Sequence, residues 1–494
     1  MQGKFVKNLV LLMILNLLIK PFWILGIDRT VQNTVGAEEY GFYFAVFNFS
    51  FLFNILLDLG ITNFNNKSIA QNRQLLTKYL SNILVLKLLL FGLYLLLTFS
   101  FAFVIDYSPE QIKLLVFLAV NQFLLSFILY LRSNLGGLHL FRTDAMISVL
   151  DRILMILICS LLLWGNVVDE FRIQYFVYAQ TAGYGITVMI TFLLVVQHAR
   201  KKWLRLNWNF PFLLAIARKS FPFAVLVLLM TFYNRIDSVM LERLLGDDGA
   251  RYSGIYASAY RLLDAANMIA YLFAVLLLPI FARMIKQKQS LEELAKLAFT
   301  LIITPAIMVA VAAFFYKTEL MQMLYPIHAG ESQAFFAHRI EESSRVFGLL
   351  MACFMVISTT YIFGTLLTAN GSLMKLNLIA FSGMLLNILL NFLLIPILFS
   401  TGSAIASLFT QSLVAITQVV IVKRMFGFRV NHVLLGKLFV FSAGLILLGL
   451  LSRQLPLPWL HSLVAFGVAG IGLALLIRLI SLRQIYALIR YGGD

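Results

Sequence analysis

The sequence predicts an all-α, multi-pass membrane protein of about fourteen membrane-spanning helices. Of its 494 residues, 61% are hydrophobic and only 12% are charged, whereas soluble domains are about 45–50% apolar and about 25% charged. Such a chain has too little polar surface to cover a globule in water. Its 44 phenylalanines suit lipid-facing and interfacial positions.

Apolar segments long enough to cross a bilayer follow one another along the whole chain. A span requires about 20 mostly apolar residues. By this rule the predicted helices are Asn8–Val35 (kinked at Pro21), Tyr40–Gly60, Tyr79–Ile105, Leu114–Leu135, Ala145–Val168, Ile173–Gln197, Lys219–Leu245, Tyr252–Ala282, Leu294–Phe315, Arg345–Ala369, Met374–Phe399, Gly402–Val422, Val433–Leu451 and Trp459–Ile480.

The charges of the short loops predict the orientation of the chain. Loops on the side of the N-terminus hold most of the basic residues, for example Arg73, Arg142 and Lys286, and the opposite loops are richer in acids such as Glu38 and Asp169. Because cytoplasmic loops carry an excess of Lys and Arg, we expect both termini in the cytoplasm. The basic residues lie in alternate loops and form no single patch, so the net charge of +17 does not indicate a nucleic-acid partner.

We expect the N-terminal segment to be an uncleaved first span, because Lys20 and Pro21 occupy the position where a signal peptide would have a small-residue cleavage site. Cys159 and Cys353 lie in apolar segments, so no disulfide framework is expected. The histidines show no metal-ligand spacing, and no G-x-x-x-x-G-K-[ST] segment occurs. We therefore expect no metal, no cofactor and no ATP hydrolysis by this chain.

A basic connector divides the chain into two halves with similar numbers of predicted helices. We expect an N-terminal six-helix bundle at 1–200, a cytoplasmic connector at 201–218, a C-terminal six-helix bundle at 219–430, and an appended helix pair with a cytoplasmic tail at 431–494. Two-lobed transporters hold their substrate between such halves near the middle of the membrane.

Four charges lie deep in the two spans that meet at the turn Gly246–Gly249. Arg235, Asp237, Arg261 and Asp264 are roughly 16 to 24 Å from that turn at about 1.5 Å per residue. Charges at this depth usually face a bundle interior or a water-filled cavity. Arg235 and Asp237 are two residues apart and cannot satisfy one another, which makes Arg235 the preferred anion ligand. Arg261 and Asp264 share a helix face, so they either line the cavity or neutralise each other.

The first half adds three candidate site residues. Lys20 lies about 18 Å along the first helix, where it either faces the cavity or forms a structural pair. Arg29, near the outer end of that helix, is either a substrate ligand or an interfacial anchor. Asp58 ends an apolar run and is an ion-pair partner, a helix cap or a coupling site for an ion. Asp237 and Asp264 are further candidates for ion coupling or charge pairing.

Other polar groups in the spans are expected to be structural. Lys87 is close enough to the cytoplasmic end of its helix to extend its ammonium group to the surface. Asp151 and Arg152 are adjacent, diverge, and lie near the cytoplasmic end of their helix. Tyr256 and Tyr260, at helical spacing, serve either as packing or as platforms for a sugar.

Three stretches together resemble the oligosaccharide-lipid flippase family, the translocases of O-antigen and capsule repeat units. They are VGAEEYGFYFAVFNFSFLFNILLDLGITNFNNKSIA (35–70), NRIDSVMLERLLGDDGARYSGIYASAYRLLDAANMI (234–269) and NFLLIPILFSTGSAIASLFTQ (391–411). The larger superfamily includes lipid II flippases and multidrug/toxin exporters. In the third stretch this chain has Gly402-Ser403-Ala404, where the family more often has a glycine-rich turn before a G-A-A run. These small residues still permit close approach of the helices.

The resemblance implies two six-helix bundles in a V that open alternately to each side, plus two extra C-terminal helices. It also implies a substrate, an oligosaccharide on polyprenyl pyrophosphate, which is moved from the cytoplasmic to the outer leaflet of the bacterial inner membrane. The partners it implies are membrane lipid and, as further candidates, a polysaccharide polymerase and glycosyltransferases. A diphosphate requires cations in a low-dielectric passage, and arginine matches phosphate oxygens in bidentate fashion.

Two other functions remain open at this point. A multidrug/toxin-type exporter of the same fold, coupled to a cation, would need acidic cavity residues for cationic drugs, whereas the deep charges here are mostly basic. A membrane-embedded glycosyltransferase or polymerase would need a catalytic outer loop or a soluble domain, and neither is evident in the sequence. We therefore expect a transporter and not an enzyme.

Overall fold

The computed structural model describes residues 15–16, 18–199, 210–328 and 330–479. Every regular element among these residues is helical. Eleven helices are long and apolar enough to cross a membrane, or up to twelve if the bent pair Leu18–Leu52 and Asn54–Gln71 forms one span. The predicted all-α, multi-pass fold class is confirmed. Residues 1–14, much of the predicted connector at 201–218 and the tail at 480–494 lie outside the described residues.

The chain divides into two compact units, Met1–Gly254 and Ile255–Asp494, each described here by itself. Unit 1 contains η1 (Trp23–Asp28), α2 (Arg29–Leu52), η2 (Asn54–Leu57), α3 (Ile61–Gln71), α4 (Leu75–Val104), α5 (Pro109–Gly137), α6 (Phe141–Trp164), α7 (Ile173–His198), α8 (Phe210–Leu244), η4 (Gly246–Asp248) and the first turn of α9 (Gly249–Lys286). Within it, α5 packs against α3 and α7, and α2 packs against α8.

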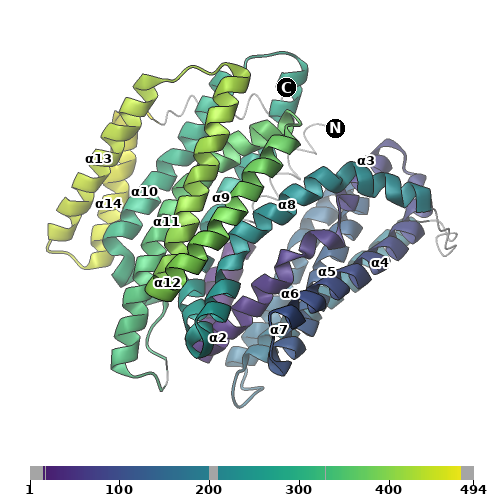
Figure 1. Cartoon of the computed structure of the whole chain (residues 1–494), viewed down its shortest axis with the longest axis horizontal. Helices are drawn as coiled ribbons and strands as arrows, with labels where there is room; N and C mark the ends of the chain where they lie inside the picture. Colours follow the sequence, from purple (N-terminus) through teal and green to yellow (C-terminus); the bar gives the residue numbers. More distant parts are fainter. Residues whose placement is uncertain (1–14, 17, 200–209, 329, 480–494) are drawn as a thin grey trace. The chain divides into compact units, whose positions relative to one another are not determined.

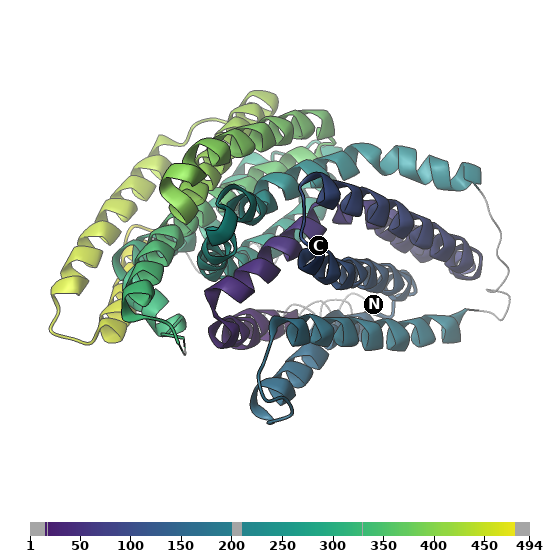
Figure 2. The same cartoon turned by 60° about the horizontal axis from the view of Figure 1, so that its bottom comes forward.

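Unit 2 contains the rest of α9 and the helices α10 (Glu292–Leu324), α11 (Gln333–Ala369), α12 (Leu373–Phe426), α13 (His432–Gln454) and α14 (Trp459–Leu476). Its most extensive packing joins α11 to α10 and to α12. The pair α13 and α14 lies side by side and packs against α10 in both views (Figures 1 and 2). Tyr316 of α10 fixes this pair from the buried side, because its hydroxyl donates a 2.6 Å hydrogen bond to Ser452 Oγ.

Two helices each turn back on themselves, which explains why fewer helices are observed than were predicted. In α12 the backbone breaks at Phe399 (φ 50°, ψ −131°), and Ser403 Oγ donates a 2.8 Å hydrogen bond to Asn391 Oδ1 twelve residues earlier. Twelve residues of straight helix would span about 18 Å. The 54 residues of α12 therefore cover both predicted spans, Met374–Phe399 and Gly402–Val422.

A similar break lies in α2. Gly36 has φ 83°, outside the helical range, and only glycine adopts such a positive φ without steric cost. Across the break, the Tyr40 hydroxyl donates a 2.9 Å hydrogen bond to Asp28 Oδ1. The bent segment Leu18–Leu52 thus contains parts of both spans predicted at Asn8–Val35 and Tyr40–Gly60, and residues 8–14 and 17 lie outside the described residues.

Side chains at the helix ends fix the turns outside the spans. Ser108 and Gln111 form a capping box at the start of α5, and Arg243 Nη1 donates to the carbonyl oxygens of Ile105 and Asp106, each at 3.1 Å. In the turn between α10 and α11, burial opposes ionisation of Glu331. Hydrogen bonds from Arg339 and from the backbone N–H of His328 outweigh burial and lower the pKa of Glu331 below its ordinary value of 4.5.

Large apolar side chains cover the outside of the molecule. Phe439, Val468 and Leu476 are 75%, 66% and 82% exposed, and this exposure of the last two helices fits contact with lipid chains. In α4 the pattern is inverted relative to a soluble protein, because Leu88 is 53% exposed while the neighbouring Lys87 is 1% exposed. The charged Lys87 side chain therefore lies in the interior of unit 1 and not on its surface.

Two glycines bring the backbone of α2 against the first turn of α9. A Cβ added to Gly41 would lie 1.8 Å from the carbonyl oxygen of Ala250, and a Cβ added to Gly254 would lie 1.7 Å from that of Ala37. Gln32 Nε2 adds a 3.0 Å hydrogen bond to the Gly254 carbonyl oxygen. Such close approach requires glycine at both positions.

Gly41→Ala and Gly254→Ala should each destabilise the protein by about 3 kcal/mol or more, because backbone must move to admit the new methyl group. Gly185→Ala is the matched control, since nothing lies within 4 Å of its added Cβ, and it should be neutral or stabilising by about 0.5–1 kcal/mol. Thermal unfolding of the purified protein in detergent measures all three. Equal melting temperatures for Gly41→Ala and Gly185→Ala would contradict the close packing.

Candidate substrate site

Inside unit 1, Lys87 is fully enclosed and satisfied by three partners. Its Nζ lies 2.7 Å from Asp58 Oδ1, 2.8 Å from the Leu57 carbonyl oxygen and 3.0 Å from Ser126 Oγ. The expectation that Lys87 extends to the cytoplasmic surface is wrong, because these bonds hold its ammonium group in the interior. The irregular backbone of η2 exposes the Leu57 carbonyl oxygen that completes the set.

Asp58 forms an ion pair with Lys87 and also caps the start of α3. Besides Lys87, it accepts hydrogen bonds from the Thr62 backbone N–H at 3.3 Å and from Thr62 Oγ1 at 2.5 Å. Asp58 is therefore an ion-pair partner that also accepts hydrogen bonds from the first turn of α3. The Asp58 side chain is 26% exposed while that of Lys87 is 1% exposed, so the pair is accessible only from the Asp58 side.

A second cationic group in unit 1 centres on Arg152 of α6. Its guanidinium carbon lies 5.6 Å from the ring centroid of Trp23 and 5.7 Å from that of Tyr184, distances at which cation–π attraction operates. Asp151 supplies a carboxylate oxygen 3.7 Å from Arg152 Nε. The three elements η1, α6 and α7 therefore meet around one guanidinium.

Lys20 belongs to the same group of charges. It interacts electrostatically with Arg152, Asp151 and Arg132, and Arg132 is itself paired with Asp144 at 2.7 Å. Lys20 thus interacts with a second cation, Arg152, which was expected from the sequence to be structural. The two cations Lys20 and Arg152 outnumber the one carboxylate of Asp151, which leaves positive charge in the interior of unit 1.

We call Lys20 and Arg152, together with the Asp151 carboxylate paired with Arg152, the cationic cluster. Aromatic and amide side chains lie near it. Trp23 stacks on Phe176 with ring centroids 5.5 Å apart, and Gln180 Nε2 donates a 3.0 Å hydrogen bond to the Tyr43 hydroxyl. These groups offer rings and hydrogen-bonding atoms beside the positive charge. Such a combination suits an anion that carries polar hydroxyl groups.

The remaining sequence-predicted residues of unit 1 lie on α2 and α8. Arg29 follows directly on the π-helix η1, and its Nε is buried without a hydrogen-bond partner among the described residues. The guanidinium carbon of Arg235 lies 5.6 Å from the centroid of the Phe51 ring on α2. Asp237 is 1% exposed, and beside it Ser238 Oγ accepts a 2.9 Å hydrogen bond from Asn48 Nδ2.

Arg261 and Asp264 belong to unit 2, on α9. Arg261 Nη1 lies 3.7 Å from Asp264 Oδ2, and both side chains are mostly buried. The pair therefore neutralises itself in the way that its spacing of three residues indicates. One turn earlier, the rings of Tyr256 and Tyr260 lie 5.5 Å apart and are 1% and 8% exposed, so they serve as packing here. The predicted common cluster of Arg235 and Arg261 stays a prediction.

The comparisons with known proteins define the class of this fold. The chain is similar to the lipid II flippase MurJ in its inward closed conformation, with a TM-score of 0.62, 15% identity, and coverage of 97% of this chain and 100% of that one. It is also similar to an inward-facing multidrug resistance MATE transporter of the MOP superfamily, with a TM-score of 0.57, 14% identity, and coverage of 82% and 94%.

A third solved structure, the bent form of the Vibrio cholerae MATE transporter VcmN, has a TM-score of 0.54, 12% identity, and coverage of 86% and 98%. No curated protein matches the chain. At these identities the likeness shows the fold alone, a multi-pass membrane fold that flippases and exporters share. Residues 5–285, more than half of the chain, match the family described as "Polysaccharide biosynthesis protein". The chain belongs to that family, which confirms the resemblance found in the sequence.

Asp58→Asn should destabilise the protein by about 3–5 kcal/mol, because it leaves the enclosed Lys87 ammonium group without its carboxylate. The double variant Asp58→Asn/Lys87→Met should recover much of that loss, since no buried charge then remains. Thermal unfolding in detergent measures both, with Glu170→Gln in an exposed ion pair as control. A fully stable Asp58→Asn protein whose transport no longer responds to pH would instead identify Asp58 as an ion-coupling site.

Proposed function

We propose that this protein translocates polyprenyl-pyrophosphate-linked oligosaccharide repeat units from the cytoplasmic to the outer leaflet of the bacterial inner membrane, for surface polysaccharide synthesis. The observation that carries this proposal is the cationic cluster of Lys20 and Arg152 beside Trp23 and Tyr184 in unit 1. Membership of the polysaccharide biosynthesis family and a fold shared with a lipid II flippase support it.

The chemistry of the cargo explains the need for these cations. A pyrophosphate carries about two negative charges, and leaving it unpaired in a medium of low dielectric constant is prohibitive. Arginine presents two parallel N–H donors to phosphate oxygens. Lys20, Arg29, Arg152 and Arg235 would therefore hold the diphosphate, with Arg261 as a further ligand if it leaves Asp264.

Alternating access would carry the head group across while the lipid tail stays outside among the helices. Six-helix bundles at 1–200 and 219–430, joined by the basic connector at 201–218, would form the two halves, and 431–494 would be appended. With both termini in the cytoplasm, export of an anion is favoured by an inside-negative potential, by about 2.3 kcal/mol per charge per 100 mV. A coupling ion at Asp58, Asp237 or Asp264 is then not obligatory.

The second candidate function is export of cationic drugs coupled to a cation. The MATE transporters among the similar structures favour it, and so does Asp237, a carboxylate that is 1% exposed. The excess of cations in unit 1 speaks against it.

Disruption of the gene distinguishes the two functions. Loss of a flippase should accumulate polyprenyl-linked repeat units, whereas loss of an exporter should leave surface polysaccharide normal and cause drug sensitivity. Sugar transfer by the purified protein would contradict both functions.

Arg152→Ala should lower transport of the lipid-linked oligosaccharide at least about tenfold, because one charge-assisted pair of hydrogen bonds to phosphate is lost. Arg152→Lys keeps the positive charge but lacks the planar guanidinium, so its transport should lie between that of the unchanged protein and that of Arg152→Ala. Restoration of surface polysaccharide in the disrupted strain provides the measurement, with membrane content of each variant determined in parallel. Arg172→Ala, at a side chain 65% exposed, is the control.

Arg235→Ala and Arg261→Ala should also lower transport while membrane insertion stays intact. Arg261→Ala is expected to have the smaller effect, since Arg261 already shares its charge with Asp264. The same complementation assay applies to both variants. Full transport by both, at normal membrane content, would remove these two residues from the site.

A further inference from the structure

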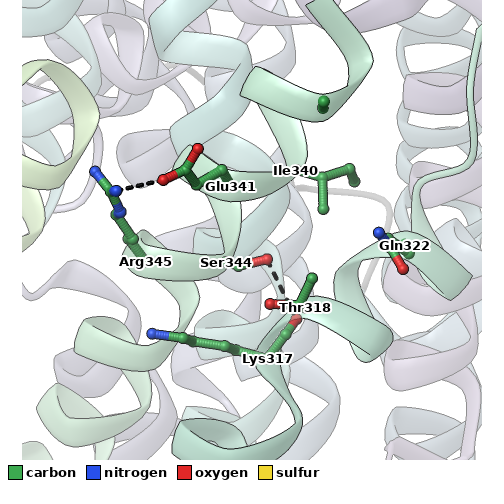
Figure 3. Close-up of a pocket in the computed structure, with 8 residues that line it drawn as sticks. Lys317, Thr318, Gln322, Ile340, Glu341, Ser344 and Arg345 are labelled. Atoms are coloured by element: carbon green, nitrogen blue, oxygen red, sulfur yellow. Dashed lines mark hydrogen bonds and ion pairs between the residues drawn. The ribbon is translucent and has the colours of Figure 1, made fainter. Parts of the chain in front are cut away.

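A cavity of about 360 Å³ lies in unit 2 between the end of α10 and the start of α11. This volume is within the range of small-molecule pockets. Figure 3 shows the residues that line it, among them Lys317 and Thr318 of α10 and Glu341, Ser344 and Arg345 of α11. The proposed transport function uses none of them.

The cavity forms where α10 changes direction. The backbone of Tyr316 departs from helical geometry (φ −118°, ψ 15°), and Lys317 is the next residue. Ser344 Oγ donates a hydrogen bond of 3.4 Å to the Lys317 carbonyl oxygen, which joins the two helices at this break. The cavity is therefore bounded by fixed elements of both helices.

The depth of the cavity matches the head groups of a lipid leaflet. Lys317 lies 25 residues after the start of α10 at Glu292, and Arg345 lies 24 residues before the end of α11 at Ala369. At 1.5 Å per residue these separations are about 38 and 36 Å, beyond a hydrocarbon core of about 30 Å. Because α10 and α11 are antiparallel neighbours, both cations reach the same membrane surface.

The charges at this depth favour a phosphate. Lys317 of α10 and Arg345 of the neighbouring α11 both line the cavity (Figure 3), and the one carboxylate of the lining, Glu341, is paired with Arg345. Two cations and one carboxylate leave a net positive charge. Ser344 and Thr318 contribute hydroxyl groups, which also bind phosphate oxygens.

An apolar side chain below the cavity points to a lipid and not to a free anion. Phe314 is 65% exposed and lies three residues from Lys317 on the membrane side, with its ring centroid 5.7 Å from Lys317 Nζ. An acyl or prenyl chain attached to the bound phosphate would run along this ring. We infer that the cavity between α10 and α11 binds the phosphate of an anionic lipid in the leaflet that these helix ends reach.

This inference does not depend on the cargo proposed above, and two lipids share the required chemistry. One is a phospholipid such as phosphatidylglycerol, and the other is a prenyl diphosphate. Binding of dioctanoyl phosphatidylglycerol and of geranyl pyrophosphate to the full-length protein in neutral detergent distinguishes the two sources. Dioctanoylglycerol and inorganic phosphate test the contributions of the chain alone and of the anion alone.

Lys317→Gln should weaken binding of at least one of the two phosphate-bearing lipids about tenfold, the loss expected for one charge-assisted hydrogen bond. Lys317→Arg should retain binding, which shows that the loss does not arise from misfolding. Glu341→Gln should strengthen binding, because it frees the Arg345 guanidinium. Lys375→Gln, at the start of α12 and at the opposite end of α11, makes the same charge change and should leave binding unaltered.

Either lipid alone, or both, responding to Lys317→Gln supports the inference, and the one that responds identifies the source. Equal losses for Lys317→Gln and Lys375→Gln would overturn it. So would inorganic phosphate binding as tightly as both lipids, because the exposed Phe314 would then contribute nothing.

Discussion

The structure depends on holding cations inside a bundle whose outer surface is apolar. Moving a charge from water into hydrocarbon is costly unless partners replace its hydration. Lys87 meets this requirement with a carboxylate, a backbone carbonyl oxygen and a hydroxyl group, all within 3.0 Å. Leucines on the same helix face outwards. This inside-out distribution makes unit 1 apolar on its outer surface and polar within.

Breaks in the helices supply part of the polar interior. Backbone groups that leave regular helical bonding are tolerated at membrane depth only where protein or water satisfies them. The short η2 follows this rule, since its Leu57 carbonyl oxygen accepts from both Lys87 and Ser126. In unit 2 the break at Phe399 is stabilised in the same manner, because Glu342 accepts a 2.9 Å hydrogen bond from the Thr401 backbone N–H. Both of these breaks therefore have a carboxylate close to them, Asp58 at η2 and Glu342 at Phe399.

The sequence was sufficient to predict the fold class, because long apolar segments and loop charges depend on local composition. It also predicted the Arg261–Asp264 pair, since three residues of helix fix that geometry. It did not predict the partners of Arg152, because Trp23 and Tyr184 are far apart in the chain and only tertiary packing brings them together. Lys87 was misjudged for the same reason. Its carboxylate lies 29 residues earlier, beyond a helix break that composition does not reveal.

Under the proposed function, cations in the interior carry a lipid-linked diphosphate across the membrane. The most direct measurement uses purified protein in liposomes that contain a fluorescent polyprenyl-pyrophosphate-linked oligosaccharide, quenched from outside by a membrane-impermeant reagent. We expect the protein to make the inner-leaflet label accessible to the quencher. A neutral polyprenol carrying the same label should cross no faster than in protein-free liposomes. Unchanged accessibility of the diphosphate lipid, together with accumulation of a cationic dye driven by an ion gradient, would contradict the proposed function.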